Sequence, residues 1–334
     1  SLLVAFAVMR RLRIRTLFRI VAVSLVIAGT VSTGLGFVLT HAINFEYQGQ
    51  KELVTKTLIA EPVKVTQVKS LDALTPIDKS TGRISAIRAR GTLNVAYLPD
   101  RLPFAYRNES GVAVGFDIDM VQDLADALDV ELNLVRLSWP EVVRGLEEGR
   151  IDMAVGGTAI TPTRAGEVLF SSTYFDHSVG FILPDHMRDT FAKLETVQRL
   201  QGLDILVPRD RHYLNYARDS FPLANLIPID SPRKFFHEGY DKDAVMLASA
   251  EAGSAWTLLY PHYGVAIPKG LAVKAPAAIA LPEGDPDFAA YINTWLLLSE
   301  KNGFISKLFD YWILGEEHHP GKPRWSILQD VLGW

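Results

Sequence analysis

The sequence contains no cysteine. Disulfide bonds, thiolate metal sites and cysteine nucleophiles are therefore excluded, and the absence is compatible with a bacterial domain outside the cytoplasm. An excess of positive charge is also missing, since 34 lysines and arginines stand against 38 aspartates and glutamates and the net charge is −4. This balance predicts no nucleic-acid partner. The length of 334 residues is enough for about two domains of ordinary size.

Motifs of catalysis and of cofactor binding are missing as well. There is no His-Glu-x-x-His motif and no phosphate-binding loop, and Ser171 and Ser172 stand outside any nucleophile elbow. His318 and His319 are adjacent but have no further ligands at a metal-binding spacing, which is typical of exposed loop residues. The sequence therefore predicts a protein that is not an enzyme and that binds no metal or cofactor.

Charged side chains are missing from residues 20–43, apart from His41 when it is protonated. A helix needs about 20 apolar residues to cross a hydrocarbon layer of ~30 Å, and this run is long enough. Five arginines precede it between residues 10 and 19, and such a cluster marks the cytoplasmic side of a membrane. We predict a transmembrane helix over residues 20–43 after a basic cytoplasmic turn over 10–19. Residues 1–9 are predicted to be the end of a preceding apolar segment.

Two other interpretations of this run stay open. One is a buried core helix. The other is a cleavable signal peptide that begins at Met9 and ends near the small residue Ala42. The run is longer than the roughly 7–15 residues usual for the apolar part of a signal peptide, which favours a retained anchor.

Residues 44–82 are polar and β-branched, contain Pro62 and Pro76, and show no periodic apolar pattern. They are predicted to form an extracytoplasmic linker with a single helix over residues 51–59. After it, the sequence predicts a helix over 84–90 that stops at Gly91, a strand over 92–98, and a further helix over 188–200. Residues 287–312 are predicted to form two helices that separate at Asn302 and Gly303.

The stretch from Gly115 to Phe175 has the pattern of a β-α-β unit. Its first helix, within residues 116–128, has apolar residues at the spacing of one buried face: Ile118, Val121, Leu124, Ala125 and Leu128. ELNLVRL then alternates like a strand, SWPEVVRGLEEGR is a helix with Pro140 in its first turn, and IDMAVGG is a buried strand that ends on two glycines.

Glycines at the end of a buried strand let a ligand approach the backbone closely, so Gly157 is a candidate binding residue. The hydroxyls of Thr158, Thr161 and Thr163 and the guanidinium of Arg164 follow it and supply hydrogen-bond donors. A guanidinium can hold a carboxylate with two parallel hydrogen bonds. The sequence therefore predicts a small ligand that carries a carboxylate.

Several motifs in order resemble those of the family 3 extracytoplasmic solute-binding proteins of the amino-acid type. They are GFDIDM, Trp-x-x-Val-Val-x-x-Leu, GG-x-x-I-T-P-x-R and F-S-S-x-Y, and the resemblance runs from about Arg83 to Gly315. It implies an α/β fold of the two-lobed periplasmic-binding-protein type II, here preceded by the predicted transmembrane helix. Lobe one would comprise residues 83–183 and 276–315, lobe two residues 184–275, and a C-terminal tail residues 316–334.

The resemblance also implies where the ligand binds. Arg164 stands at the position of the family's carboxylate anchor, Trp139 at that of an aromatic residue that stacks on the ligand, and Phe104 in a Pro-Phe that lines the pocket. Arg101 stands where the family often has an aromatic residue. The family's hydroxyl is replaced by Ala159, so Thr158 could take its place, whereas Thr161 could only cap the following helix.

Two acidic residues have open roles. Asp117 could contact the ligand or could organise the turn at a helix start. Glu251 is the acid nearest to the end of the strand DAVMLA, where the family commonly has an aspartate for the ligand amine. Either Glu251 takes that role or the ligand has no amine. Arginines on the expected cleft loops favour an anionic ligand, an acidic amino acid or a dicarboxylate: Arg101, Arg164, Arg209 and Arg211.

The sequence thus predicts a membrane-anchored domain on the extracytoplasmic side of the bacterial inner membrane. It would capture a small carboxylate by hinge closure and present it to a membrane transporter, and the arrangement resembles fusions of such domains with a sodium:dicarboxylate symporter. Two alternatives stay open. One is the ligand-sensing domain of a membrane receptor, and the other is a dehydratase-like enzyme with Glu251 and His212 as its acid and base.

Overall fold

The computed structural model describes residues 23–24, 49–78, 80, 82–209 and 211–315. The chain divides into a unit of residues 1–48 and a unit of residues 49–334. The predicted apolar segment 1–9, the basic turn 10–19, nearly all of the predicted span 20–43 and the tail 316–334 lie outside the described residues. Among the helices that are described, none combines the length and the hydropathy needed to cross a membrane.

Lobe one is built on a six-stranded sheet in the order β1-β5-β2-β6-β14-β7. Its first four strands are parallel, and β14 is antiparallel to β6 and β7. The strands are β1 (Val65–Val68), β5 (Glu131–Arg136), β2 (Thr92–Tyr97), β6 (Met153–Val155), β14 (Ala280–Leu281) and β7 (Leu169–Phe170). The predicted β-α-β unit is therefore confirmed, because β5 and β6 are parallel strands on either side of β2.

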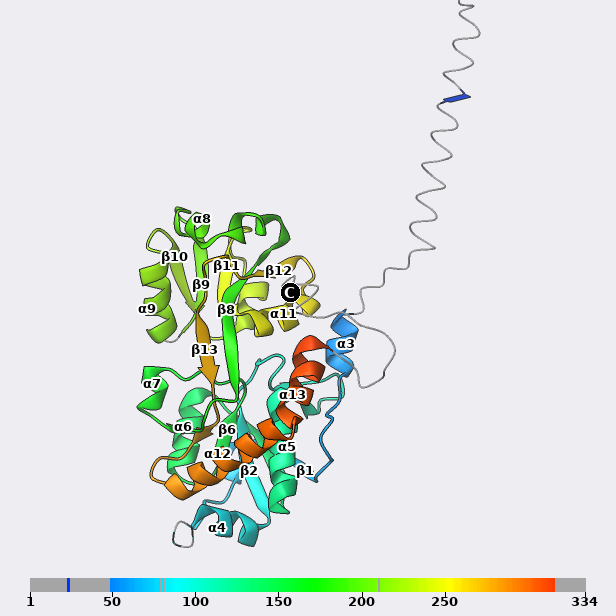
Figure 1. Cartoon of the computed structure of the whole chain (residues 1–334), viewed down its shortest axis with the longest axis vertical. Helices are drawn as coiled ribbons and strands as arrows, with labels where there is room; N and C mark the ends of the chain where they lie inside the picture. The colour runs from blue at the N-terminus through cyan, green and yellow to red at the C-terminus, as the bar shows by residue number, and fades with distance from the viewer. Residues whose placement is uncertain (1–22, 25–48, 79, 81, 210, 316–334) are drawn as a thin grey trace, which may run out of the picture. The chain divides into compact units, whose positions relative to one another are not determined.

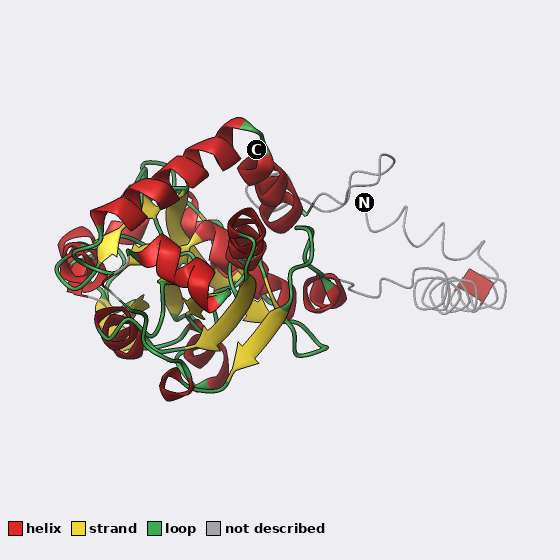
Figure 2. Ribbon diagram, turned by 90° about the horizontal axis from the view of Figure 1, so that it is seen from below, coloured by secondary structure: helices red, strands yellow, loops and turns green. Residues whose placement is uncertain are grey.

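Helices cover this sheet because each presents one apolar face. All five apolar residues predicted to be buried on α5 (Phe116–Leu128) are buried. Figure 2 shows helices enclosing the strands. The other helices of lobe one are α4 (Arg83–Arg90), α6 (Trp139–Glu147), α7 (Pro162–Ala165), α12 (Pro286–Lys301) and α13 (Phe304–Phe309). A short hairpin of β3 (Tyr106–Arg107) and β4 (Ala113–Val114) precedes α5.

Lobe two has a second sheet in the order β10-β9-β11-β8-β12. These strands are β10 (Asn225–Ile229), β9 (Asp204–Pro208), β11 (Val245–Ser249), β8 (Phe175–Pro184) and β12 (Tyr263–Ala266), and the helices are α8 (Leu194–Gln198), α9 (Arg211–Ser220), α10 (Pro232–His237) and α11 (Ala250–Leu259). Its core includes Phe181, whose ring packs against Phe191 and Phe221 at centroid distances of 5.0 and 5.4 Å.

A long strand, β8, and a short one beside it connect the lobes. Strand β8 pairs with β11 and β12 through its second half and with β13 (Lys274–Ala277) through its first half. In Figure 1, β8 and β13 run beside each other from one sheet to the other. Paired crossover strands of this kind form a hinge, as the family resemblance implied.

Part of the predicted linker belongs to the folded unit. Helix α3 (Gly49–Thr55) contacts α11 of lobe two, and the Leu53 carbonyl accepts a hydrogen bond of 2.9 Å from the Tyr106 hydroxyl of lobe one. The backbone N–H groups of Ile59 and Ala60 donate to Asp119, and residues 65–68 then form β1 at the sheet edge. The linker prediction is wrong for these residues because an exposed edge strand has no alternating apolar pattern.

The helix predicted over residues 188–200 is also wrong for most of its length. Residues 190–192 form a 3-10 turn, Lys193 is extended, and only residues 194–198 are α-helical. The reason is a tertiary contact, since Lys193 forms a β-bridge with Lys269 and the Leu194 N–H donates to the Lys269 carbonyl. Local helix propensity is weaker than such pairing.

Candidate functional site

The glycine pair at the end of β6 is held by a buried carboxylate. Gly156 and Gly157 both have positive φ angles, of 130° and 57°, and their N–H groups donate to Asp117 Oδ2 at 2.6 and 2.7 Å. The Tyr174 hydroxyl donates to the same oxygen at 2.7 Å. Asp117 is completely buried and holds the glycine turn after β6, which is neither of the two roles expected for it, since no side chain caps the start of α5.

Burial raises the pKa of Asp117 from 3.8 to about 6, although the Gly157, Tyr174 and Gly156 donors and His177 oppose the rise. Between these two pKa values the folded state holds a proton that the unfolded state has released. The contribution of Asp117 to stability therefore falls as the pH rises from about 4 to about 6. Above pH 6 this contribution is constant.

We expect Asp117→Asn to remove this pH dependence, because an amide stays neutral and its oxygen can still accept from the glycines. The measurement is the urea midpoint of both chains between pH 4 and pH 7. Relative to the variant, the unsubstituted chain should lose stability as the pH rises through this window. Asp72→Asn changes an exposed carboxylate and is the control. Parallel curves for Asp117→Asn and the unsubstituted chain would contradict the expectation.

Phe104 lies behind the glycine pair and not at the surface of the cleft. Its side chain is buried and packs against Phe116, Phe175 and His177 at centroid distances of 5.9, 5.2 and 4.9 Å. A Cβ atom on Gly157 would lie 2.8 Å from the Phe104 ring. The Phe104 ring therefore packs directly against Gly157 and leaves no room for a side chain there.

Arg164 is positioned by its own loop and by an aromatic ring. Its Nη1 donates to the Ala159 carbonyl at 2.9 Å, and its guanidinium carbon lies 4.9 Å from the centroid of the Trp139 ring. Trp139 is in turn held by a hydrogen bond of 2.6 Å from its indole N–H to Glu167. In this structure Trp139 therefore orients Arg164, and both side chains are half-buried.

Arg101 shares this region with Arg164. Burial and, to a smaller extent, the positive charge of Arg164 lower the pKa of Arg101 to about 10, although Tyr213 of α9 and Asp100 act in the opposite direction. Helix α7, which carries Arg164, contacts α9 of lobe two. Two guanidiniums of lobe one thus lie close enough to interact, on the side where α7 contacts lobe two.

The remaining predicted site residues have other surroundings. Thr158 is buried, and its hydroxyl has no hydrogen-bond partner among the described residues. Both oxygens of Glu251 accept from the Ser178 N–H of the hinge strand, at 3.0 and 3.1 Å, and His177 Nδ1 lies 3.8 Å away. Arg209 is exposed and pairs with Asp230 of its own lobe at 2.6 Å. Arg211 begins α9.

The profile of the bacterial extracellular solute-binding proteins, family 3, matches residues 93–315. The chain belongs to this family. Its two lobes and the paired strands between them are thus the parts of a family 3 solute-binding protein. The match extends over both lobes and begins within β2, after α3, β1 and α4.

Relatives of this family 3 protein include both binders and an enzyme. It is 27% identical to the cyclohexadienyl dehydratase of Pseudomonas aeruginosa, over 73% of this chain and 91% of that protein. It is 23% identical to the L-cystine-binding protein of Escherichia coli, over 69% and 86%. A solved structure of an ancestral amino acid-binding protein, a precursor of cyclohexadienyl dehydratase, superposes with a TM-score of 0.61 at 25% identity, over 69% and 98%.

Sequence reasoning missed the contact between the lobes of this family 3 protein. Asp100, directly before Arg101, accepts hydrogen bonds from Ser231 Oγ at 3.1 Å and Arg233 Nη2 at 2.9 Å, both from lobe two. It also missed His177, which faces Gly157 and Glu251. No local pattern marks these residues, because their partners are far away in the sequence.

Proposed function

We propose that this domain captures a small anionic carboxylate between its two lobes and delivers it for transport. The observation that carries the proposal is the pairing of Arg101 and Arg164 at one edge of lobe one. The two guanidiniums repel each other, since the positive charge of Arg164 lowers the pKa of Arg101. A ligand carboxylate would relieve this repulsion and accept charge-assisted hydrogen bonds.

The position of Glu251 bears on which carboxylate is bound. An acidic amino acid brings an ammonium group that needs an acceptor, whereas the Glu251 carboxylate is directed to the Ser178 N–H at the hinge. Of the two alternatives drawn from the sequence, this supports a ligand without an amine. A dicarboxylate is therefore our first candidate and an acidic amino acid the second.

The test is calorimetry on the 334-residue chain with succinate, glutamate, aspartate, cystine and arginine. We expect saturable heats with the acidic ligands, strongest with succinate, and none with arginine. Binding of arginine or cystine, with no heat from any acidic ligand, would overturn the proposal.

Closure of the lobes is the proposed mechanism, and the hydrogen bonds of Asp100 to lobe two belong to the closed arrangement. Although burial opposes the effect, Arg233 and Ser231 lower the pKa of Asp100, so the carboxylate is ionised and joins lobe one to lobe two. A ligand that contacts both lobes stabilises the same closed arrangement. Asp100 and the ligand therefore act together without touching the same groups.

Asp100→Ala is expected to weaken ligand binding about fivefold, because a half-buried pair of this kind contributes ~1 kcal/mol to the closed arrangement. Calorimetry gives the affinity, and small-angle scattering of the ligand-free chain should show a larger radius of gyration for the variant. Asp185→Ala removes an exposed acid that pairs with Arg188 within lobe two and should change neither quantity. Unchanged affinity and unchanged scattering for Asp100→Ala would exclude this role.

The membrane anchor and the transporter partner are part of the same proposal. The uncharged run 20–43 and the five arginines before it support an anchor with the binding domain outside the cytoplasm. An upstream symporter of dicarboxylates would be the partner that receives the ligand. Alkaline extraction of membranes tests the anchor, because a spanning chain stays in the pellet and a peripheral chain is released.

An enzyme on this fold is the competing function, since one relative is a dehydratase. Elimination of water needs an acid or base that faces the ligand, whereas Glu251 is directed to the Ser178 N–H. We therefore propose binding without turnover. Formation of a dehydrated product from a cyclohexadienyl acid would reverse this choice.

A further inference from the structure

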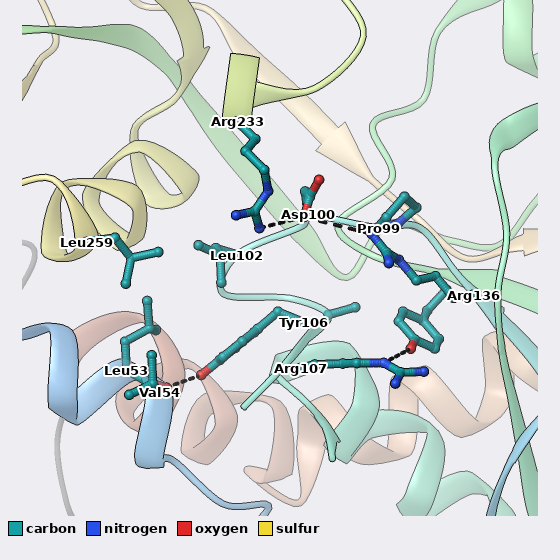
Figure 3. A pocket seen from close by; sticks show the side chains of 12 residues that line it. Leu53, Val54, Pro99, Asp100, Leu102, Tyr106, Arg107, Arg136, Arg233 and Leu259 are labelled. Carbon is teal, nitrogen blue, oxygen red and sulfur yellow. Dashed lines mark hydrogen bonds and ion pairs between the residues drawn. The ribbon is translucent and has the colours of Figure 1, made fainter. Parts of the chain in front are cut away.

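A cavity lies where α3 meets the two lobes. It has a volume of about 290 Å³ and is lined by residues of α3, of lobe one and of lobe two. Arg101 and Arg164 do not line it. Figure 3 shows the cavity between the end of α3, the loop after β2 and the side chains of Arg233 and Leu259.

One side of this cavity carries positive charge. Arg107 and Arg136 flank Tyr97, because Arg107 Nε donates to the Tyr97 hydroxyl at 3.3 Å and Arg136 is the register neighbour of Tyr97 between β5 and β2. The one carboxylate in the lining is Asp100, which lies 4.0 Å from Arg136 but bonds Arg233 at 2.9 Å. Three guanidiniums against one carboxylate leave the lining with an excess of positive charge.

The opposite side is apolar. Leu53 and Val54 of α3, Leu102 and Leu259 project toward the space, and Figure 3 shows them across the cavity from Arg107 and Arg136. Apolar walls with a few charged groups at one end are the usual composition of a small-molecule site. A cavity of about 150 Å³ is enough for benzene, so this one has room for a ring and a carboxylate.

We propose that this cavity is a second ligand site for a small carboxylate with one aromatic ring or a short alkyl chain. The carboxylate binds Arg107 and Arg136, which can each donate parallel hydrogen bonds. The apolar body packs against Leu53 and Leu259. The cavity does not include Arg101 or Arg164, but it shares Asp100 and Arg233 with the proposed closure of the lobes.

The probe for this site is para-fluorophenylacetate, followed by fluorine NMR on the 334-residue chain. We expect saturable binding that is at least tenfold weaker for the neutral analogue para-fluorobenzyl alcohol. The double variant Arg107→Gln, Arg136→Gln should weaken binding of the acid at least tenfold. Val54→Trp should abolish it by filling the cavity, and thermal unfolding of each variant confirms that it folds.

Two variants separate this site from the cleft and from general charge effects. Arg164→Gln should leave binding of the probe unchanged, and so should Arg88→Gln, which changes an exposed arginine of α4. If Arg164→Gln abolishes binding of the probe and the double variant still binds it, the probe binds beside Arg164 and the proposal is overturned. No saturable binding to the unsubstituted chain would overturn it too.

Discussion

Arg164→Gln should weaken binding of the acidic ligand at least a hundredfold. Two charge-assisted hydrogen bonds to a carboxylate contribute about 1.5–3 kcal/mol each, and about 1.4 kcal/mol corresponds to a factor of ten. The glutamine is shorter, neutral and unable to stack as a cation on Trp139, 4.9 Å from the Arg164 guanidinium. Calorimetry with succinate and glutamate measures the loss.

Two further variants show whether the charge of Arg164 or its planar geometry determines the affinity for the ligand. Arg164→Lys keeps the charge but loses the planar fork, so an intermediate affinity is expected. Arg218→Gln changes an exposed arginine of α9 that bonds Asn215, and it should bind like the unsubstituted chain. If Arg164→Gln binds the acidic ligands normally, Arg164 is not the anchor of the carboxylate.

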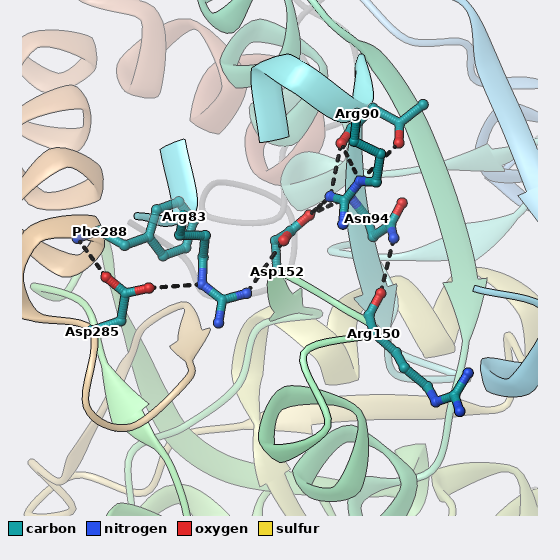
Figure 4. A network of polar contacts seen from close by, with 8 residues as sticks. Arg83, Arg90, Asn94, Arg150, Asp152, Asp285 and Phe288 are labelled. Carbon is teal, nitrogen blue, oxygen red and sulfur yellow. Dashed lines mark hydrogen bonds and ion pairs between the residues drawn. The ribbon is translucent and has the colours of Figure 1, made fainter. Parts of the chain in front are cut away.

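Asp152→Ala should have the largest effect on stability, a loss of about 3–5 kcal/mol in the free energy of unfolding. Asp152 is completely buried just before β6 and accepts from Arg83 Nη1 at 3.3 Å, from Arg90 Nη2 and from the Asn94 N–H at 2.8 Å (Figure 4). Arg83 also bonds Asp285 at the start of α12. Removing the central carboxylate leaves buried guanidinium charge and an unpaired N–H group.

Urea unfolding of the variant measures this loss. The matched control is Glu148→Ala, which removes an exposed ion pair with Arg150 of 2.6 Å and should cost less than about 1 kcal/mol. Because Asp152 is remote from the cleft arginines, ligand affinity of the folded fraction should be retained. Equal effects of the two substitutions would mean that the network contributes little.

Much of lobe one could be predicted from local pattern alone. The apolar spacing of α5, the stop of α4 at Gly91 in a left-handed conformation and the glycines after β6 all agree with the structure. These features depend on neighbours three or four residues away or on the backbone freedom of glycine. The spacing of apolar residues therefore predicted the helices that bury a single apolar face.

The site could be predicted only in part. The motif identified Arg164 and Trp139, but not that the ring lies against the guanidinium. Glu251 follows the strand DAVMLA as expected, yet its carboxylate is directed to the Ser178 N–H of the hinge. The direction of a side chain depends on partners that are distant in the sequence. Such contacts produce no regular spacing of residues in the sequence, so a local pattern cannot predict them.

By itself the sequence determined the family, the order of most helices and strands, and the glycine-threonine-arginine loop, because motif and period are local properties of a chain. Tertiary structure alone decided that α3 and β1 belong to the folded unit, that Asp117 supports a turn, and that Asp100 joins the lobes. Each of these depends on hydrogen bonds between residues that only the folded chain brings together.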